Sequence, residues 1–167
     1  ADIWGRADAF HFLDQAWEGD LEITARVLSV EKTDPWAKAG IMIRASLTET
    51  SPHAMVAMTP EKGPVFIRRL EAGGASKDDA HQAMRMIRRN ETSLFQQRGS
   101  AGVDQATDSP TALPAPRWIK LVRRAQVLMA YDSNDAVTWE WLGTETLNLP
   151  ANCYIGLAVT SHAASRV

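Results

Sequence analysis

Apolar and polar residues alternate along most of the chain, as the two faces of a β-strand require. The clearest case follows Asp34-Pro35, where proline ends the preceding element and favours an extended start. From there one predicted strand face carries Trp36, Lys38, Gly40, Met42 and Arg44, and the other carries Ala37, Ala39, Ile41, Ile43 and Ala45. The second set is uniformly apolar and predicts a core face. The first set is typical of either an exposed face or a binding face, in which glycine would let a ligand approach the backbone.

The same alternation predicts strands elsewhere. The expected strands cover residues 9–15, 21–30, 36–44, 53–59, 65–70, 118–123, 127–131, 137–142 and 153–161. Pro60-Glu61-Lys62-Gly63 predicts a hairpin turn. The last strand is apolar almost throughout and is expected in the middle of a sheet. About nine short strands with few helical segments predict an all-β fold, an antiparallel β-sandwich.

The pattern is weaker between about residues 76 and 112, which we interpret as an insertion. One interpretation is a second hairpin with strands at about 83–88 and 93–97, and the alternative is a helix over 78–89 capped by Ser76. Residues 99–116 are rich in Ser, Thr, Gly, Ala and Pro and predict a long surface loop. We therefore expect a single domain over residues 1–167. The sequence begins and ends abruptly, and one interpretation is that an edge strand of the predicted sandwich is missing at each end.

The composition of the chain limits the classes of function that it can have. A chain of 167 residues that is 45% hydrophobic can bury one core, and its net charge of −2 provides no global field for nucleic acid or an anionic membrane. No apolar run approaches the roughly 20 residues that cross a bilayer, so no membrane insertion is expected. The single cysteine, Cys153, lies among apolar residues and predicts a buried thiol.

Several stretches together resemble a known family. They are residues 1–11, 19–27, 34–44, 118–123 and 154–162, and they are similar to bacterial extracellular domains of the concanavalin A-like lectin/glucanase superfamily, near the "regulation of enolase protein" group. The resemblance implies a jelly roll of two curved antiparallel sheets. It also implies a module of a larger multidomain protein, located outside the cell or on its surface, that handles polysaccharide.

Glycan binding requires flat aromatic faces for sugar rings and polar groups for their hydroxyls. The candidate ligand-binding residues, on strands expected to lie side by side, are Trp36, Lys38, Arg44, His53, Arg68 and Trp118. The alternative interpretation is that the tryptophans cover a sheet edge and the charged groups face solvent.

Catalytic and metal chemistry are the other candidates. Glu18, Asp20 and Glu22, or Glu140 and Glu145, could supply the two carboxyl groups of a glycosidase, but neither set has the Glu-x-Asp-x-x-Glu pattern of the laminarinase-type relatives. Asp132, Asn134 and Asp135 could bind a structural calcium, although the same residues are ordinary turn formers. The histidines have no zinc-site spacing.

Arg85, Arg88, Arg89 and Arg98 form a basic cluster without the interleaved aromatics of a nucleic-acid site. These observations favour a non-catalytic carbohydrate-binding or surface-adhesion module with no required cofactor. The alternatives are a glycan-active enzyme that uses carboxylates in the sheet groove, and a structural spacer or protein-interaction domain.

Overall fold

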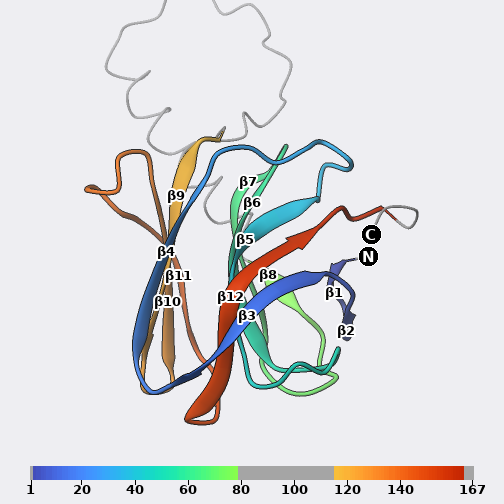
Figure 1. The fold of residues 1–167 in the computed structure, drawn as a ribbon, viewed down its shortest axis with the longest axis vertical. Coiled ribbons are helices and arrows are strands. Elements are labelled where there is room, and N and C mark those ends of the chain that lie inside the picture. The colour runs from blue at the N-terminus through green and yellow to red at the C-terminus, as the bar shows by residue number, and fades with distance from the viewer. Residues whose placement is uncertain (1, 79–114, 164–167) are drawn as a thin grey trace, which may run out of the picture.

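The computed structural model describes residues 2–78 and 115–163, and both interpretations of the 76–112 insertion fall largely outside these ranges. The described residues form two large antiparallel sheets packed face to face, and a separate two-stranded sheet of β1 and β2 (Figure 1). One sheet has six strands in the order β3-β12-β5-β6-β7-β8, and the other has four in the order β11-β10-β9-β4. The predicted β-sandwich is confirmed.

The strands are β1 (Ile3–Trp4), β2 (Ala7–Asp8), β3 (His11–Glu18), β4 (Leu21–Val27), β5 (Lys38–Arg44), β6 (His53–Thr59), β7 (Gly63–Arg69), β8 (Lys77–Asp78), β9 (Arg117–Arg124), β10 (Val127–Ser133), β11 (Glu140–Thr146) and β12 (Asn152–Thr160).

Each of the nine strands expected outside the insertion has a counterpart, and most errors lie at strand ends. The range predicted for β6 is correct, and β12 is an interior strand of the six-stranded sheet, between β3 and β5. The strand predicted at 137–142 instead begins at Glu140, because Asp135 accepts hydrogen bonds from the backbone N–H groups of Val137 and Thr138 and holds them in a turn. The two-residue strands β1, β2 and β8 are too short to show alternation and were not predicted.

The main core lies between the sheets. The predicted apolar face of β5 supplies Ile41 and Ile43, which pack with Phe66 of β7 and Leu121 of β9. Cys153 is 1% exposed within this core, so the predicted buried thiol is confirmed.

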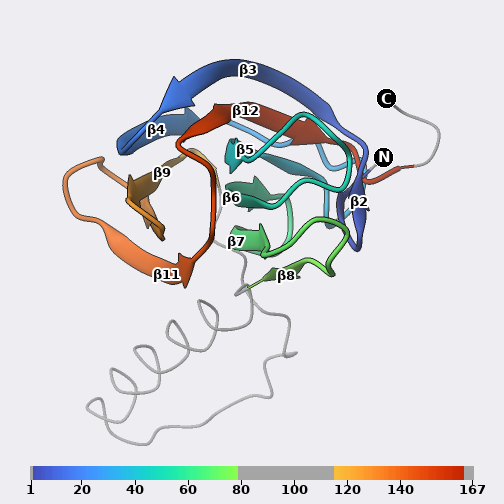
Figure 2. The same cartoon turned by 90° about the horizontal axis from the view of Figure 1, so that it is seen from below.

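A second, smaller core lies on the outer face of the six-stranded sheet. Ile3 of β1 is fully buried there against Met42, Met55 and Ile67. Figure 2 shows the β1–β2 hairpin on the side of the six-stranded sheet that faces away from the four-stranded sheet. The N-terminal residues therefore cover a face that alternation alone would leave open to solvent. Among the described residues, no helix is long and apolar enough to span a bilayer.

Gly40 has a different role from the expected one. A Cβ atom at Gly40 would lie 2.1 Å from the carbonyl oxygen of Val56 on the neighbouring β6. The missing side chain therefore makes room for the adjacent strand and not for a ligand. Gly156 of β12 is equivalent, because a Cβ there would lie 1.9 Å from the carbonyl oxygen of Leu13 on β3.

Candidate ligand-binding pocket

The polar face of β5 is buried rather than open. Lys38 is 3% exposed and Arg44 is 2% exposed, while His53 on the adjacent β6 is completely buried. Arg44 and His53 are paired across the two strands, as the prediction of neighbouring strands requires. The β1–β2 hairpin and its flanking residues cover them.

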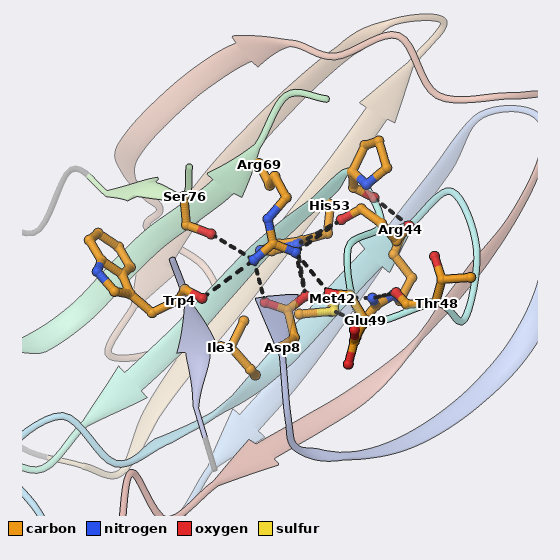
Figure 3. A network of polar contacts seen from close by, with 12 residues as sticks. Ile3, Trp4, Asp8, Met42, Arg44, Thr48, Glu49, His53, Arg69 and Ser76 are labelled. Carbon is orange, nitrogen blue, oxygen red and sulfur yellow. Dashed lines mark hydrogen bonds and ion pairs between the residues drawn. The ribbon is translucent and has the colours of Figure 1, made fainter. Parts of the chain in front are cut away.

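An ion-pair network around Asp8 holds this cover in place (Figure 3). Arg69 of β7 donates to both carboxylate oxygens of Asp8, at 2.7 and 2.8 Å, in a bidentate pair. The Arg44 guanidinium lies 3.5 Å and the His53 imidazole 3.4 Å from Asp8 Oδ2. Burial raises the pKa of Asp8, and the two guanidinium groups oppose that change.

Arg69 was not among the sequence candidates, although it is the centre of this network. It is completely buried and also donates to the backbone carbonyls of Gly5, Glu49 and Gly74. One side chain thereby fixes the hairpin and two loops to the end of the six-stranded sheet. In this structure Arg44 and His53 belong to a buried polar network that supports the fold.

Arg68 and Trp118 lie in two other places. Arg68 is mostly buried at the edge of the sandwich, where its Nε donates to Glu145 at 3.2 Å and its Nη1 donates to the carbonyl of Phe66 at 3.0 Å. Trp118 lies on the outer face of the four-stranded sheet, with the Arg26 guanidinium 5.8 Å from its ring centre. The structure therefore does not bring the six candidate residues together on one surface.

Trp36 and Lys38 do share a pocket of about 310 Å³ on the outer face of the six-stranded sheet. Its other lining residues come from both ends of the described chain and from β7 and β8: Asp2, Trp4, Ile67, Asp78 and His162. Trp4 is 42% exposed and Trp36 is half-buried, so both indoles remain accessible. Lys62 lies 5.7 Å from the centre of the Trp36 ring and supports it.

A chain of ion pairs forms one wall of the pocket. Lys38 Nζ lies 2.5 Å from Asp2 Oδ1, and His162 Nε2 lies 3.1 Å from Asp2 Oδ2. The other ring nitrogen of His162 lies 3.0 Å from Asp34 Oδ1. His162 thereby links two carboxylates, Asp2 from the N-terminal segment and Asp34 from the turn before β5.

The backbone at this wall is unusual. His162 has φ of +56°, a left-handed conformation that is uncommon for a non-glycine residue. Asp34 also accepts the backbone N–H of Trp36 at 2.7 Å, which is the main cause of its lowered pKa. The same turn therefore positions the Trp36 indole and the partner of His162.

The candidate calcium loop has other partners in this structure. Asp132 is buried and paired with Arg117, which also donates to Asn134 Oδ1 at 2.6 Å. Hydrogen bonds, chiefly from the backbone N–H groups of Thr138 and Val137, lower the pKa of Asp135 to about 2. Within residues 2–78 and 115–163, no three His, Cys, Asp or Glu side chains are placed to hold one metal ion together. These contacts fit turn formation, and calcium binding stays a prediction.

The candidate carboxyl pairs for hydrolysis are engaged elsewhere. Asp20 accepts the backbone N–H of Ala125 at 2.6 Å, and Glu22 lies 3.6 Å from Lys120. Partial burial raises the pKa of Glu145, but hydrogen bonds from Lys77 and Arg68 outweigh this effect and lower the pKa overall. A lowered pKa is the opposite of what a general acid requires.

Sequence reasoning missed Trp4, Asp78 and His162 as members of this pocket. They are separated from Trp36 by 32, 42 and 126 positions in the chain, and no local spacing joins them. Of these residues, only Trp4 gave a signal for a binding site. An indole beside the N-terminal turn at Gly5 is costly to expose to solvent, which indicates that it has a function.

Comparisons with known proteins bear on the fold. No family model matches the chain, and no curated protein matches it. Among solved structures, a functionally unknown protein from Saccharomyces cerevisiae is similar with a TM-score of 0.59 at 16% identity, over 96% of this chain and 74% of that chain. A point mutant of the GH43 protein BlXynB from Bacillus licheniformis aligns at a TM-score of 0.48 and 15% identity, over 93% of this chain and 25% of that chain. The similarity to the yeast protein supports the β-sandwich, and the second alignment is too weak to carry an argument.

Proposed function

We propose that this protein is a non-catalytic carbohydrate-binding or surface-adhesion module of a secreted protein, and that it binds sugar in the pocket lined by Trp4 and Trp36. The observation that carries the proposal is the convergence of two accessible indoles with carboxylate and imidazole groups in one pocket of about 310 Å³. Indole faces can pack on the C–H surface of a sugar ring, and the polar groups can hold its hydroxyls.

The state of Asp2 supports binding rather than hydrolysis. One of its oxygens is paired with Lys38 and the other with His162, so both oxygens already have partners within the protein. Asp78 lines the same pocket, and this is the observation that keeps a glycan-active enzyme as the second candidate.

A glycan array followed by calorimetry with the best neutral oligosaccharide tests the proposal. Trp36→Ala and Trp4→Ala should each weaken binding by about 30-fold, the loss of about 2 kcal/mol that is typical when an aromatic anchor is removed. Trp17→Ala is the matched control, because this indole is 38% exposed on β3 and does not line the pocket. The affinity of Trp17→Ala for the oligosaccharide should equal that of the unmodified protein.

Three outcomes would overturn the proposal. Unchanged affinity in both pocket variants would exclude this pocket, and absence of binding to any glycan would favour a structural spacer. Release of reducing sugar from a bound glycan, abolished by Asp78→Asn, would replace it with the enzyme alternative.

A further inference from the structure

Aromatic side chains also gather on the outer face of the four-stranded sheet, far from the pocket. The register pairs Tyr131 of β10 with Lys120 of β9 on one side and with Trp141 of β11 on the other, and Trp118 lies two residues before Lys120 on the same face of β9. Their sequence neighbours Ile119, Leu121, Ala130 and Leu142 belong to the main core, so the aromatic residues point outward. Trp139, next to β11, joins this group, because Lys120 Nζ lies 4.0 Å from its ring centre.

This face is open to water. Trp141 is 48% exposed, and Trp118, Tyr131 and Trp139 are half-buried. Three of the six tryptophans and one of the two tyrosines thus lie on one side of one sheet without entering a core. A contiguous exposed aromatic surface is costly in a soluble domain and marks an interaction site.

The charge of this face differs from that of the whole protein. Lys120 lies 4.0 Å from the Trp139 ring centre and 5.6 Å from that of Tyr131, and the Arg26 guanidinium lies over Trp118. Arg124 lies on the same side of β9, whereas β4 contributes one carboxylate, Glu22, at 3.6 Å from Lys120. On this side of β4 and β9 themselves, the three cations outnumber the one acid, although the net charge of the protein is −2.

We propose that this aromatic face, formed by Trp118, Tyr131, Trp139 and Trp141 with Arg26 and Lys120, binds an acidic polysaccharide whose sugar rings carry carboxylate groups. Aromatic rings on a sheet surface offer successive stacking positions for sugar rings, and Lys120 and Arg26 stand among those positions to pair with carboxylates. An extended polymer suits an open sheet face better than a small molecule, which needs an enclosing pocket.

The same features argue against single-stranded nucleic acid as the ligand. Bases would also stack on these rings, but affinity for a phosphate backbone depends on neutralising many phosphates at once. This face offers three cations partly opposed by Glu22, which is sufficient for a few carboxylates along a polysaccharide and few for a polyphosphate.

Affinity electrophoresis in gels that contain polygalacturonate tests the inference, with uncharged galactan as the matched polymer. Polygalacturonate should retard the protein and galactan should not, and added salt should weaken the retardation by polygalacturonate. Trp141→Ala and Lys120→Met should each weaken binding by about tenfold, and Trp17→Ala should not change it. Melting temperatures identify any variant that fails to fold. Trp141→Ala is the main test variant, because the Trp141 side chain is already half exposed in the folded protein.

Three results would overturn the inference. They are equal retardation by galactan, binding by Trp141→Ala and Lys120→Met that matches the unmodified protein, and binding of oligo(dT) without binding of polygalacturonate. The pocket proposal is tested with short neutral oligosaccharides and pocket variants, so failure of either proposal is recognised separately.

Discussion

At the scale of single residues, the buried imidazole of His53 predicts how stability depends on pH. Burial, together with the charges of Arg69 and Arg44, lowers the pKa of His53 to about 3. In the unfolded chain its pKa is about 6.5, so between these two values the unfolded state binds the extra proton. The stabilising contribution is complete above about pH 6.5 and is lost as the pH falls toward about 3.

The expected loss from His53 between pH 7 and pH 5 is about 2 kcal/mol in the free energy of unfolding. Urea unfolding at both pH values measures it. His53→Gln removes the titrating group and should reduce the difference between the two pH values by that amount. His11→Gln, at an exposed position of β3, is the control and should keep the pH dependence. An unchanged pH dependence in His53→Gln would show that other groups cause it.

At the scale of strands, the two glycines of the six-stranded sheet predict local effects of added side chains. Gly156→Ala would place a Cβ 1.9 Å from the carbonyl oxygen of Leu13, and β3 is an edge strand held in the sheet by β12. We expect a loss of about 1–3 kcal/mol in the free energy of unfolding, the usual cost of overpacking. Amide hydrogen exchange should become faster along β3 and stay slow along β6 and β7.

Gly40→Ala provides the comparison, because its Cβ would press on β6 instead. Exchange should then increase at the β5–β6 pairing, in the centre of the sheet, with β3 less affected. If both variants loosened the same strands, close backbone approach would not be the reason for glycine at these positions.

Strand alternation predicted the sandwich well but could not predict what covers each face. The row from Lys38 to Arg44 does lie on one side of β5, as its period of two required. Its burial depends on Ile3 and Asp8, whose strands of two residues carry no periodic signal. The sequence predicts that Lys38 faces solvent, and only the structure shows that it is paired with Asp2.

The candidate site shows the same limit more strongly. Trp36 was predicted because the alternation that begins there is regular, although β5 itself begins at Lys38. His162 was not, because it enters the pocket from the other end of the described chain, beside Asp2. Such contacts depend on how all the strands are arranged, which local patterns do not encode. The aromatic face was missed for another reason: the alignment of Trp139 and Trp141 with Trp118 depends on the order of strands in the sheet.

At the scale of the whole molecule, Asp8 joins the N-terminal hairpin to the six-stranded sheet. Asp8→Asn would leave the buried guanidinium groups of Arg69 and Arg44 without their carboxylate. We expect a loss of about 3–5 kcal/mol, the usual cost of removing one partner of a buried ion pair. Glu18→Gln, at an exposed position of β3, should change stability by less than about 0.5 kcal/mol.

The position of the hairpin also predicts which binding surface this substitution affects. Asp2 and Trp4 belong to the segment that Asp8 anchors, so loosening it should weaken oligosaccharide binding in the pocket. The aromatic face lies on the other sheet and shares no residue with the hairpin, so folded Asp8→Asn protein should still bind polygalacturonate. Calorimetry and affinity electrophoresis on the same preparation, below its melting temperature, compare the two surfaces. Equal losses at both would mean that the hairpin stabilises the whole sandwich and does not specifically shape the pocket.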